Sequence, residues 1–369
     1  MTTTGTESRR LRLGTRGSRL ALTQSGQVAE ALRQAAAAGA LGEGSGGLGI
    51  DLVTVRTDGD GDRTPLRQLG GVGVFAARLR HALLDGEVDL VVHSFKDLPT
   101  QPVEGLEVIC VPPREDPRDA LCARDGLTLA TLPDGARVGT GSPRRAAQLL
   151  AARPDLEVVD LRGNVPTRLA RVRGLEAVGV GTDEPVAPAR ADAASDLGAV
   201  VLALSGLRRL GLEHCASEVL DLETMLPAPA QGALAVEARA GEDSAELARA
   251  VAALDDEPTR LAVTAERALM ARLGAGCAAP VGAWAHLRGG EQEQRVLVLR
   301  AVVTSLDGGQ EVGCELSTEL PEASGGPGAP GNTAAVRAAE ALGARAAEVL
   351  LEDGAAQIVD LHANKPRRD

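Results

Sequence analysis

A cluster of polar side chains between His93 and Asp97 contains residue types that acid–base chemistry uses. Residues 89–92 before it are predicted to form a short apolar strand, and Pro99 prevents the strand from continuing. In an open α/β sheet, ligands bind beyond the carboxyl ends of the strands. A carboxylate and an ammonium group at neighbouring positions can serve proton transfer. Asp97 is therefore the first candidate for a catalytic residue, and the alternative is that Lys96 and Asp97 only solvate a surface loop.

The composition limits the classes of protein to consider. A length of 369 residues, with 44% hydrophobic and 24% charged residues, predicts a globular protein of two or three domains. The net charge of -12, together with one Trp, two Phe and no Tyr, argues against nucleic-acid binding. No apolar run is long enough to span a membrane and residues 1–12 are polar, so we expect a cytoplasmic protein. The five cysteines form no Cys-x-x-Cys pair, which argues against a disulfide framework and a zinc site, and we expect no metal.

The pattern of strands and turns occurs twice along the chain. Residues 11–14 are predicted to be a strand that leads through a turn at Arg16 and Ser18 into a helix over 19–38, and residues 136–142 repeat this pattern. Free amides at a helix start favour a carboxylate or phosphate there. Strands expected at 50–55 and 89–92 have counterparts at 156–161 and 199–204. The repeat predicts two similar lobes with a ligand in the cleft between them.

The predicted fold class is α/β with three domains: two lobes of type II periplasmic-binding-protein-like topology and a small C-terminal α/β domain. Lobe 1 is expected to comprise residues 1–111 and 232–253, lobe 2 residues 112–231, and the C-terminal domain residues 254–369. The C-terminal domain is expected to contain helices at 258–273 and 333–351 and strands at 295–304 and 311–316. We also expect a loop over a site at 57–73, an insertion at about 180–196 and a hinge at 226–232.

Lobe 2 is rich in arginine at its predicted strand ends. These residues are Arg144, Arg145, Arg162, Arg168 and Arg209. Arginine binds carboxylates and phosphates with two parallel hydrogen bonds, so a ligand that carries several such groups fits this lobe. The alternative for each arginine taken singly is an ordinary surface residue.

Three further motifs have residue types associated with other chemistry. Cys277 has small neighbours that leave its sulfur open to attachment of a bulky group, and the alternative is an inert, half-buried thiol. The sequence from Gly71 to Ala76 matches a dinucleotide fingerprint but lacks the strand that must precede it. Aspartates alternate over residues 58–62 as in a calcium loop, but the bidentate Glu that such a loop needs does not follow.

Eight motifs follow one another along the chain in a characteristic order. They are LGTRGSRLAL (13–22), VHSFKDLP (92–99), REDPRD (114–119), GTGSPRR (139–145), LRGNVPTR (161–168), GLRRLG (206–211), PAPAQGA (227–233) and GC (276–277). In this set and order the chain resembles the porphobilinogen deaminase family, also called hydroxymethylbilane synthases. The resemblance covers residues 11–284 and becomes thinner toward the C-terminus.

The resemblance implies an enzyme that joins four porphobilinogen molecules head to tail into the linear tetrapyrrole hydroxymethylbilane and releases ammonia at each addition. It implies a dipyrromethane cofactor held by a thioether to Cys277. Asp97 matches the family's catalytic aspartate. A carboxylate beside the pyrrole N–H can stabilise the azafulvenium cation left when ammonia departs and can aid proton transfer at the ring carbon.

The same resemblance implies which residues hold the acetate and propionate groups of cofactor and substrate. They are Arg16, Ser18, Lys96, Thr140, Ser142, Arg144, Arg145, Arg162, Arg168 and Arg209. Phe75 aligns with an aromatic residue that packs near the pyrrole rings. The chain departs from the family at Gln68 and Val72, where lysines are common, and at Ala230, where Gly is usual.

The sequence is also compatible with two other functions. A two-lobed anion-binding or sensor protein would explain the repeat and the arginines without needing Cys277. A nicotinamide enzyme rests only on the incomplete motif at Gly71. For the enzyme we expect porphobilinogen as substrate, no nucleic-acid or membrane partner, and a monomer.

Overall fold

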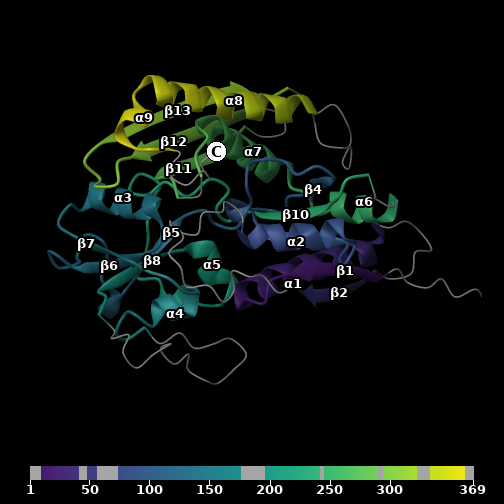
Figure 1. Cartoon of the computed structure of the whole chain (residues 1–369), viewed down its shortest axis with the longest axis horizontal. Coiled ribbons are helices and arrows are strands. Elements are labelled where there is room, and N and C mark those ends of the chain that lie inside the picture. The colour runs from purple at the N-terminus through teal and green to yellow at the C-terminus, as the bar shows by residue number, and fades with distance from the viewer. Residues whose placement is uncertain are drawn as a thin grey trace, which may run out of the picture.

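The computed structural model describes residues 10–40, 48–55, 74–175, 196–241, 245–276, 278–289, 294–321 and 333–361. The described strands form three sheets, two of five strands and one of three. The two lobes lie side by side, and the C-terminal unit lies above both of them in the view of Figure 1. Within the described residues, no helix combines the length and the apolar character needed to cross a membrane.

The first lobe is built on a five-stranded sheet. Its strands lie in the order β2 (Gly49–Thr54), β1 (Arg10–Thr15), β3 (Leu90–Ser94), β10 (Leu234–Arg239) and β4 (Leu106–Cys110). Its helices are α1 (Arg19–Ala35), extended by a π turn (Ala36–Ala40), α2 (Val74–Leu84) and α6 (Ala245–Ala252). Strand β1 is parallel to β2 and β3, whereas β10 is antiparallel to both of its neighbours. This pairing supports our proposal that residues 232–253 belong to lobe 1.

The second lobe repeats this arrangement. Its strands lie in the order β7 (Glu157–Asp160), β6 (Arg137–Thr140), β8 (Ala199–Ala203), β5 (Asp119–Ala123) and β9 (Glu218–Val219). Its helices are α3 (Pro143–Ala152), α4 (Val165–Leu169) and α5 (Leu204–Arg209). The fourth strand of the order, β5, is again antiparallel, as β10 is in lobe 1. The predicted repeat and the predicted fold class are therefore confirmed.

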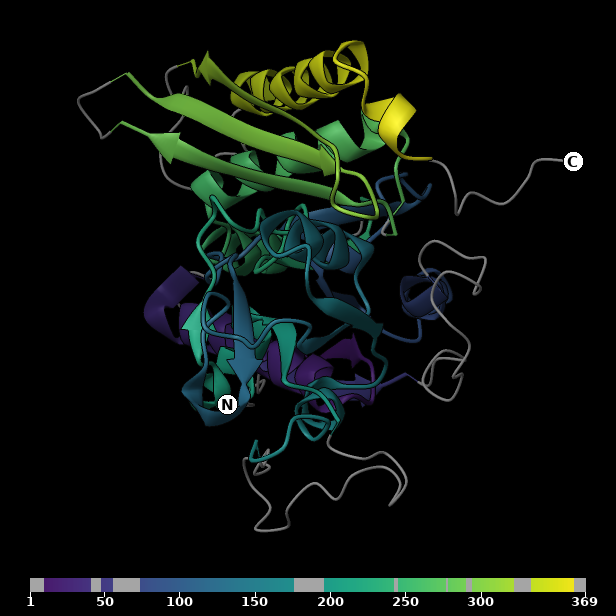
Figure 2. The same ribbon diagram turned by 90° about the vertical axis from the view of Figure 1, so that its left-hand side faces the viewer.

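The C-terminal unit is an antiparallel sheet covered by helices. It contains α7 (Glu257–Leu273), β11 (Val281–Arg288), β12 (Val296–Thr304), β13 (Glu311–Glu319), α8 (Thr333–Glu352) and α9 (Ala355–Ile358). Alternate residues of β12 face the helices and form the core with them, since side chains alternate between the two faces of a strand. Figure 2 shows the long strands with the helices behind them. A Cβ at Gly343 would lie 2.1 Å from the Ala265 carbonyl oxygen, so α7 and α8 pack with almost no space between their backbones.

The predicted helix and strand limits agree with the structure in most places. Helix α7 ends where expected, because Gly274 takes the left-handed conformation (φ 62°) and caps it. One prediction was wrong: β3 continues through His93 and Ser94, which were expected to follow the strand. Strand β10 pairs with both residues, and His93 donates from Nε2 to Glu237 on β10 at 3.2 Å, so tertiary pairing overrides the change to polar side chains.

Other predictions lie outside the described residues. These are the loop at 57–73 and the insertion at 180–195. Helix α2 packs into lobe 1 through Leu79, Ala82 and Leu83, which are buried. The three domain boundaries remain a proposal.

Candidate active site

Residues 95–99 follow β3 directly, and we call them the catalytic loop because they contain the predicted catalytic residue Asp97. Residues Phe95–Asp97 form a short 3-10 turn, in which the ring of Phe95 is buried while the side chain of Asp97 is exposed. The Lys96 ammonium is half-buried and donates to Gln231 Oε1 at 3.3 Å. Burial lowers the pKa of Lys96 to about 8, while Asp97 opposes this shift and Arg145 adds to it. The loop thus presents an exposed carboxylate beside an ammonium that is easily deprotonated.

The start of α3 in lobe 2 faces this loop. Thr140 is the last residue of β6, and Ser142 caps α3 by accepting from the Arg145 amide at 3.5 Å, with Pro143 in the first helical position. A Ser side chain accepts from a free amide at the start of a helix, and Pro suits the first helical position because it has no N–H to satisfy. Arg144 and Arg145 therefore stand in the first turn of the helix.

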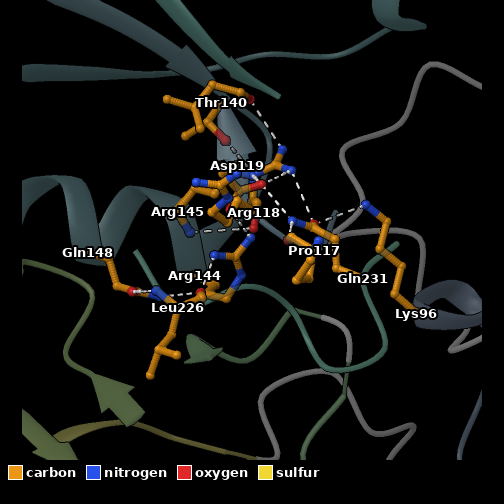
Figure 3. Close-up of polar contacts among 12 residues, drawn as sticks. Lys96, Pro117, Arg118, Asp119, Thr140, Arg144, Arg145, Gln148, Leu226 and Gln231 are labelled. Carbon is orange, nitrogen blue, oxygen red and sulfur yellow. Dashed lines mark hydrogen bonds and ion pairs between the residues drawn. The ribbon is translucent and has the colours of Figure 1, made fainter. Parts of the chain in front are cut away.

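A buried carboxylate holds these two arginines (Figure 3). Asp119 on β5 is fully buried and accepts from Arg144 Nη2 at 2.8 Å and from Arg145 Nη2 at 2.7 Å. Gln231, from the segment between the lobes, donates to the same carboxylate at 2.8 Å. Arg144 also donates to the Leu226 carbonyl at 2.6 Å. Asp119 thus joins two cations of lobe 2 to the segment that connects the lobes.

The network around Asp119 contains two arginines and one carboxylate, so positive charge exceeds negative charge in it. Burial alone would raise the pKa of Asp119, but Arg144 and Arg145 outweigh it and hold this pKa far below its usual range. Burial lowers the pKa of Arg144. Among the described residues, the Nε of Arg144 is buried without a hydrogen-bond partner. The two arginines were predicted to bind a ligand's carboxylates, and in this structure they already have an internal one.

Arg168 of lobe 2 brings a positive charge toward Asp97 and interacts with the neighbouring Arg162. Arg168 donates from Nε to the Gly163 carbonyl at 2.7 Å. Its pKa is lowered to about 10, mainly by burial and further by repulsion from Arg145 and Arg162. Asp97 attracts the same guanidinium from the other lobe. The catalytic loop and the arginines of lobe 2 therefore share one electrostatic site, which we call the interlobe site and define as Lys96, Asp97, Arg145, Arg162 and Arg168.

The remaining predicted ligand-binding residues have more local contacts. Ser18 caps α1 by accepting from the Ala21 amide at 3.3 Å, and Arg16 is half-buried just after β1. Arg209, at the end of α5, donates to the Gly232 carbonyl at 2.6 Å, and burial lowers its pKa while Glu115 opposes this shift. Because β1 is parallel to β3, Arg16 and the catalytic loop emerge at the same edge of the sheet.

Two predicted residues cannot be placed with their side chains. Phe75 is in α2 but its side chain is not among those described, and Cys277 lies outside the described residues. The other four cysteines are poor nucleophiles: burial raises the pKa of Cys110 and Cys122 to about 12 and of Cys314 to about 11, and it raises the pKa of Cys215. A thiol with such a pKa stays protonated near neutral pH.

The residues that support the site were not predicted from the sequence. Asp119 and Gln231 lie within two of the eight motifs, and that position was the only signal for them. Glu266 and Arg267 on α7 carried no signal, because charged residues in a helix usually face solvent. A groove of about 560 Å³ also exists between α3 and the outer face of β12 and β13, but no predicted site residue lines it.

The interlobe site suits a ligand with several carboxylates. Arg162 has a buried Nη2 without a hydrogen-bond partner among the described residues, and neighbouring cations disfavour the charge of Arg168. A dipyrromethane with acetate and propionate groups would supply the missing acceptors and neutralise this repulsion. The donor set therefore fits such a cofactor.

Fold and site together define a class: a two-lobed α/β protein that places one exposed carboxylate and several cations between its lobes. Two family models match the chain, "Porphobilinogen deaminase, dipyromethane cofactor binding domain" over residues 11–247 and "Porphobilinogen deaminase, C-terminal domain" over residues 260–352. The porphobilinogen deaminase of Cutibacterium acnes is 52% identical over 97% of this chain and 99% of its own. That of Micrococcus luteus is 51% identical (94% and 93%), and that of Thermobifida fusca 48% identical (94% and 95%). The chain belongs to the porphobilinogen deaminase family.

Proposed function

We propose that this chain is a hydroxymethylbilane synthase, a transferase of tetrapyrrole biosynthesis that condenses four porphobilinogen molecules head to tail. Family membership over nearly the whole chain supports this function. The structural observation that carries it is the exposed carboxylate of Asp97 in the electrostatic reach of Arg168 from the opposite lobe. This arrangement can bind carboxylates and handle a proton at the same place.

The reaction requires one carboxylate to act at two moments. In each addition the carbon–nitrogen bond of the substrate's aminomethyl group breaks and ammonia leaves, so the remaining pyrrole carries positive charge. Asp97 stabilises this charge as a fixed anion. A carbon–carbon bond then forms at the free ring carbon of the acceptor, which loses a proton to the same carboxylate. Water finally releases the product.

The cations have a binding role in this proposal. Lys96, Arg162 and Arg168 hold acetate and propionate groups. Arg144 and Arg145 form a pair of neighbouring cations that the Asp119 carboxylate holds in place. Arg16, Ser18, Thr140, Ser142 and Arg209 extend the binding surface along the strand ends. Ion pairs in such a partly buried site are stronger than on the open surface.

Cys277 is proposed to hold the dipyrromethane through a thioether, and Phe75 to pack near the pyrrole rings. When bound, the group supplies the free pyrrole carbon at which chain growth starts. The four described cysteines have raised pKa values, which supports the assignment of the attachment to Cys277. We also propose that the protein acts as a monomer in the cytoplasm, and light scattering would test the monomer.

The intact mass of the purified protein tests the proposal most directly. We expect an adduct of two pyrrole units that is absent in Cys277→Ser. Asp97→Asn should fold normally but turn over porphobilinogen at least ~100-fold more slowly, as expected for loss of a positioned acid–base group. Asp134→Asn, at a fully exposed carboxylate, is the matched control. An unmodified mass without turnover would instead support the anion-binding protein.

A further inference from the structure

Helix α7 of the C-terminal unit contacts the catalytic loop through one side chain. Arg267 donates from Nη1 to the carbonyls of Phe95 at 3.3 Å and Leu98 at 2.7 Å, and from Nη2 to the Pro99 carbonyl at 2.8 Å. Its guanidinium also lies over the Phe95 ring, 4.5 Å from the centroid. A single side chain therefore holds three carbonyls of a five-residue loop, and Lys96 and Asp97 lie between them.

These contacts fix the turn that aims Asp97. The Leu98 amide donates to the Phe95 carbonyl at 3.2 Å, so Arg267 binds the same carbonyl that closes the turn. A planar guanidinium can reach several acceptors in fixed directions, whereas a lysine ammonium is a single point charge. Hydrogen bonds from a charged donor are also stronger than those from a neutral one.

The residue before Arg267 anchors the same helix to the rest of the protein. Glu266 is fully buried and accepts from Arg114 Nη1 at 2.7 Å, from the Ala230 amide at 2.5 Å and from the Ala285 amide at 2.7 Å. Ala230 lies in the segment between the lobes and Ala285 in β11. One turn of α7 is thus bonded to the catalytic loop, to the interlobe segment and to its own sheet.

Helix α7 also leads to the predicted cofactor attachment. It ends at Leu273, about 9 Å along the axis from Arg267 at 1.5 Å per residue, and Cys277 follows four residues later. A rigid helix therefore connects the loop that carries Asp97 to the segment that carries Cys277.

We propose that Arg267 is a positioning residue of the condensation reaction, which holds the catalytic loop in a fixed orientation against helix α7. This inference rests on the proposed function, but the hydrogen bonds from Arg267 to the catalytic loop are a property of the fold. Arg267 does not touch the substrate; it acts through the backbone of residues 95–99. Its loss lowers the rate of the chemical step more than it weakens substrate binding.

The test compares Arg267→Gln and Arg267→Lys with Arg272→Gln in the full-length protein. Arg272 lies on the same helix with an exposed side chain paired to Glu348, so it controls for loss of a helical arginine. Hydrogen exchange resolved to single amides over residues 90–100 reports the loop, and kcat and KM for porphobilinogen report the reaction. Intact mass and thermal unfolding restrict the comparison to folded protein that carries the adduct.

We expect Arg267→Gln to speed exchange at the Leu98 amide about tenfold and to lower kcat about tenfold or more, with a smaller change in KM. Arg267→Lys should lie between this variant and wild type, and Arg272→Gln should match wild type. Exchange and kcat at wild-type values in folded Arg267→Gln would overturn the proposal. If Arg267→Gln fails to fold, wild-type values in Arg267→Lys would do so.

The two proposals fail in different ways. If the wild-type protein does not turn over porphobilinogen, the proposed function fails, and exchange at the Leu98 amide still decides whether Arg267 clamps the loop. If the wild type is active and its Arg267→Gln variant is equally active, the function stands and the positioning role is refuted.

Discussion

Replacing Asp119 by Asn tests whether this buried carboxylate holds Arg144 and Arg145 of lobe 2 in place. The substitution keeps the size of the side chain but removes its charge. The new amide group also presents a donor to side chains that themselves donate, namely Arg144, Arg145 and Gln231. Two buried guanidinium groups would then lack their shared anion.

The expected loss of stability follows from this geometry. Removing one partner of a buried ion pair costs about 3–5 kcal/mol, because the other charge stays buried and unpaired. For a domain of the size of lobe 2, 1 kcal/mol corresponds to about 4 °C in the unfolding midpoint. Asp119→Asn should therefore lower the midpoint of lobe 2 by roughly 12–20 °C.

Differential scanning calorimetry measures this shift, with Asp51→Asn as the control. Asp51 pairs with Arg10 at an exposed site, where an ion pair contributes little, so the control should move the midpoint by about 4 °C at most. Because the pKa of Asp119 is lowered in the folded state, its contribution is present at neutral pH and is lost as the pH falls below about 4. The difference between wild type and Asp119→Asn should narrow there. A shift at pH 7 no larger than that of the control would refute the reasoning.

Three further predictions follow from other parts of the structure. Since the pKa of Lys96 is about 8, its ammonium loses charge as the pH rises through that value. The KM for porphobilinogen should therefore rise above pH 8 in wild type but not in Lys96→Arg. A wild-type KM that does not change with pH would contradict this prediction. Ala230 is buried and has a φ of 62°. In Ala230→Gly, relieved backbone strain offsets the lost methyl group, so the free energy of unfolding should stay within about 1 kcal/mol of wild type. Ala230→Val should be destabilised by about 2 kcal/mol or more, and thermal unfolding measures both. Gly343→Ala should destabilise the C-terminal unit by about 2 kcal/mol, because the new Cβ clashes with Ala265. Gly26→Ala in α1 is the control: a Cβ there meets nothing within 4 Å, so this variant should be neutral or stabilising. Equal effects of the two substitutions would be inconsistent with the close packing of α7 and α8.

The sequence allowed much of the fold to be predicted because its local signals agree with the final pairing. Ser18 and Ser142 mark two helix starts, Gly274 marks the end of α7, and the repeated strands lie at equivalent places in both sheets. Strands β5, β9 and β11 were missed. Strand β9 has only two residues, and β5 pairs with β8 and β9, which lie far later in the chain.

The candidate site was predicted by residue type but not by partner. The arginines indicated carboxylate binding, yet Asp119 lies 25 and 26 residues from the two that it holds, and no periodicity links them. Arg267 contacts a loop about 170 residues earlier in the chain, which no local pattern could reveal. Polar contacts across domains therefore had to come from the folded structure.

The internal partner of Arg144 and Arg145 changes how much charge the enzyme can offer a growing product. Two guanidinium groups facing one carboxylate leave one net positive charge, so the count of arginines overstates the supply of cations. Each added pyrrole brings two more carboxylates, and this demand grows faster than the fixed supply. We therefore expect the carboxylates of the later rings to be matched by mobile counter-ions or to remain hydrated.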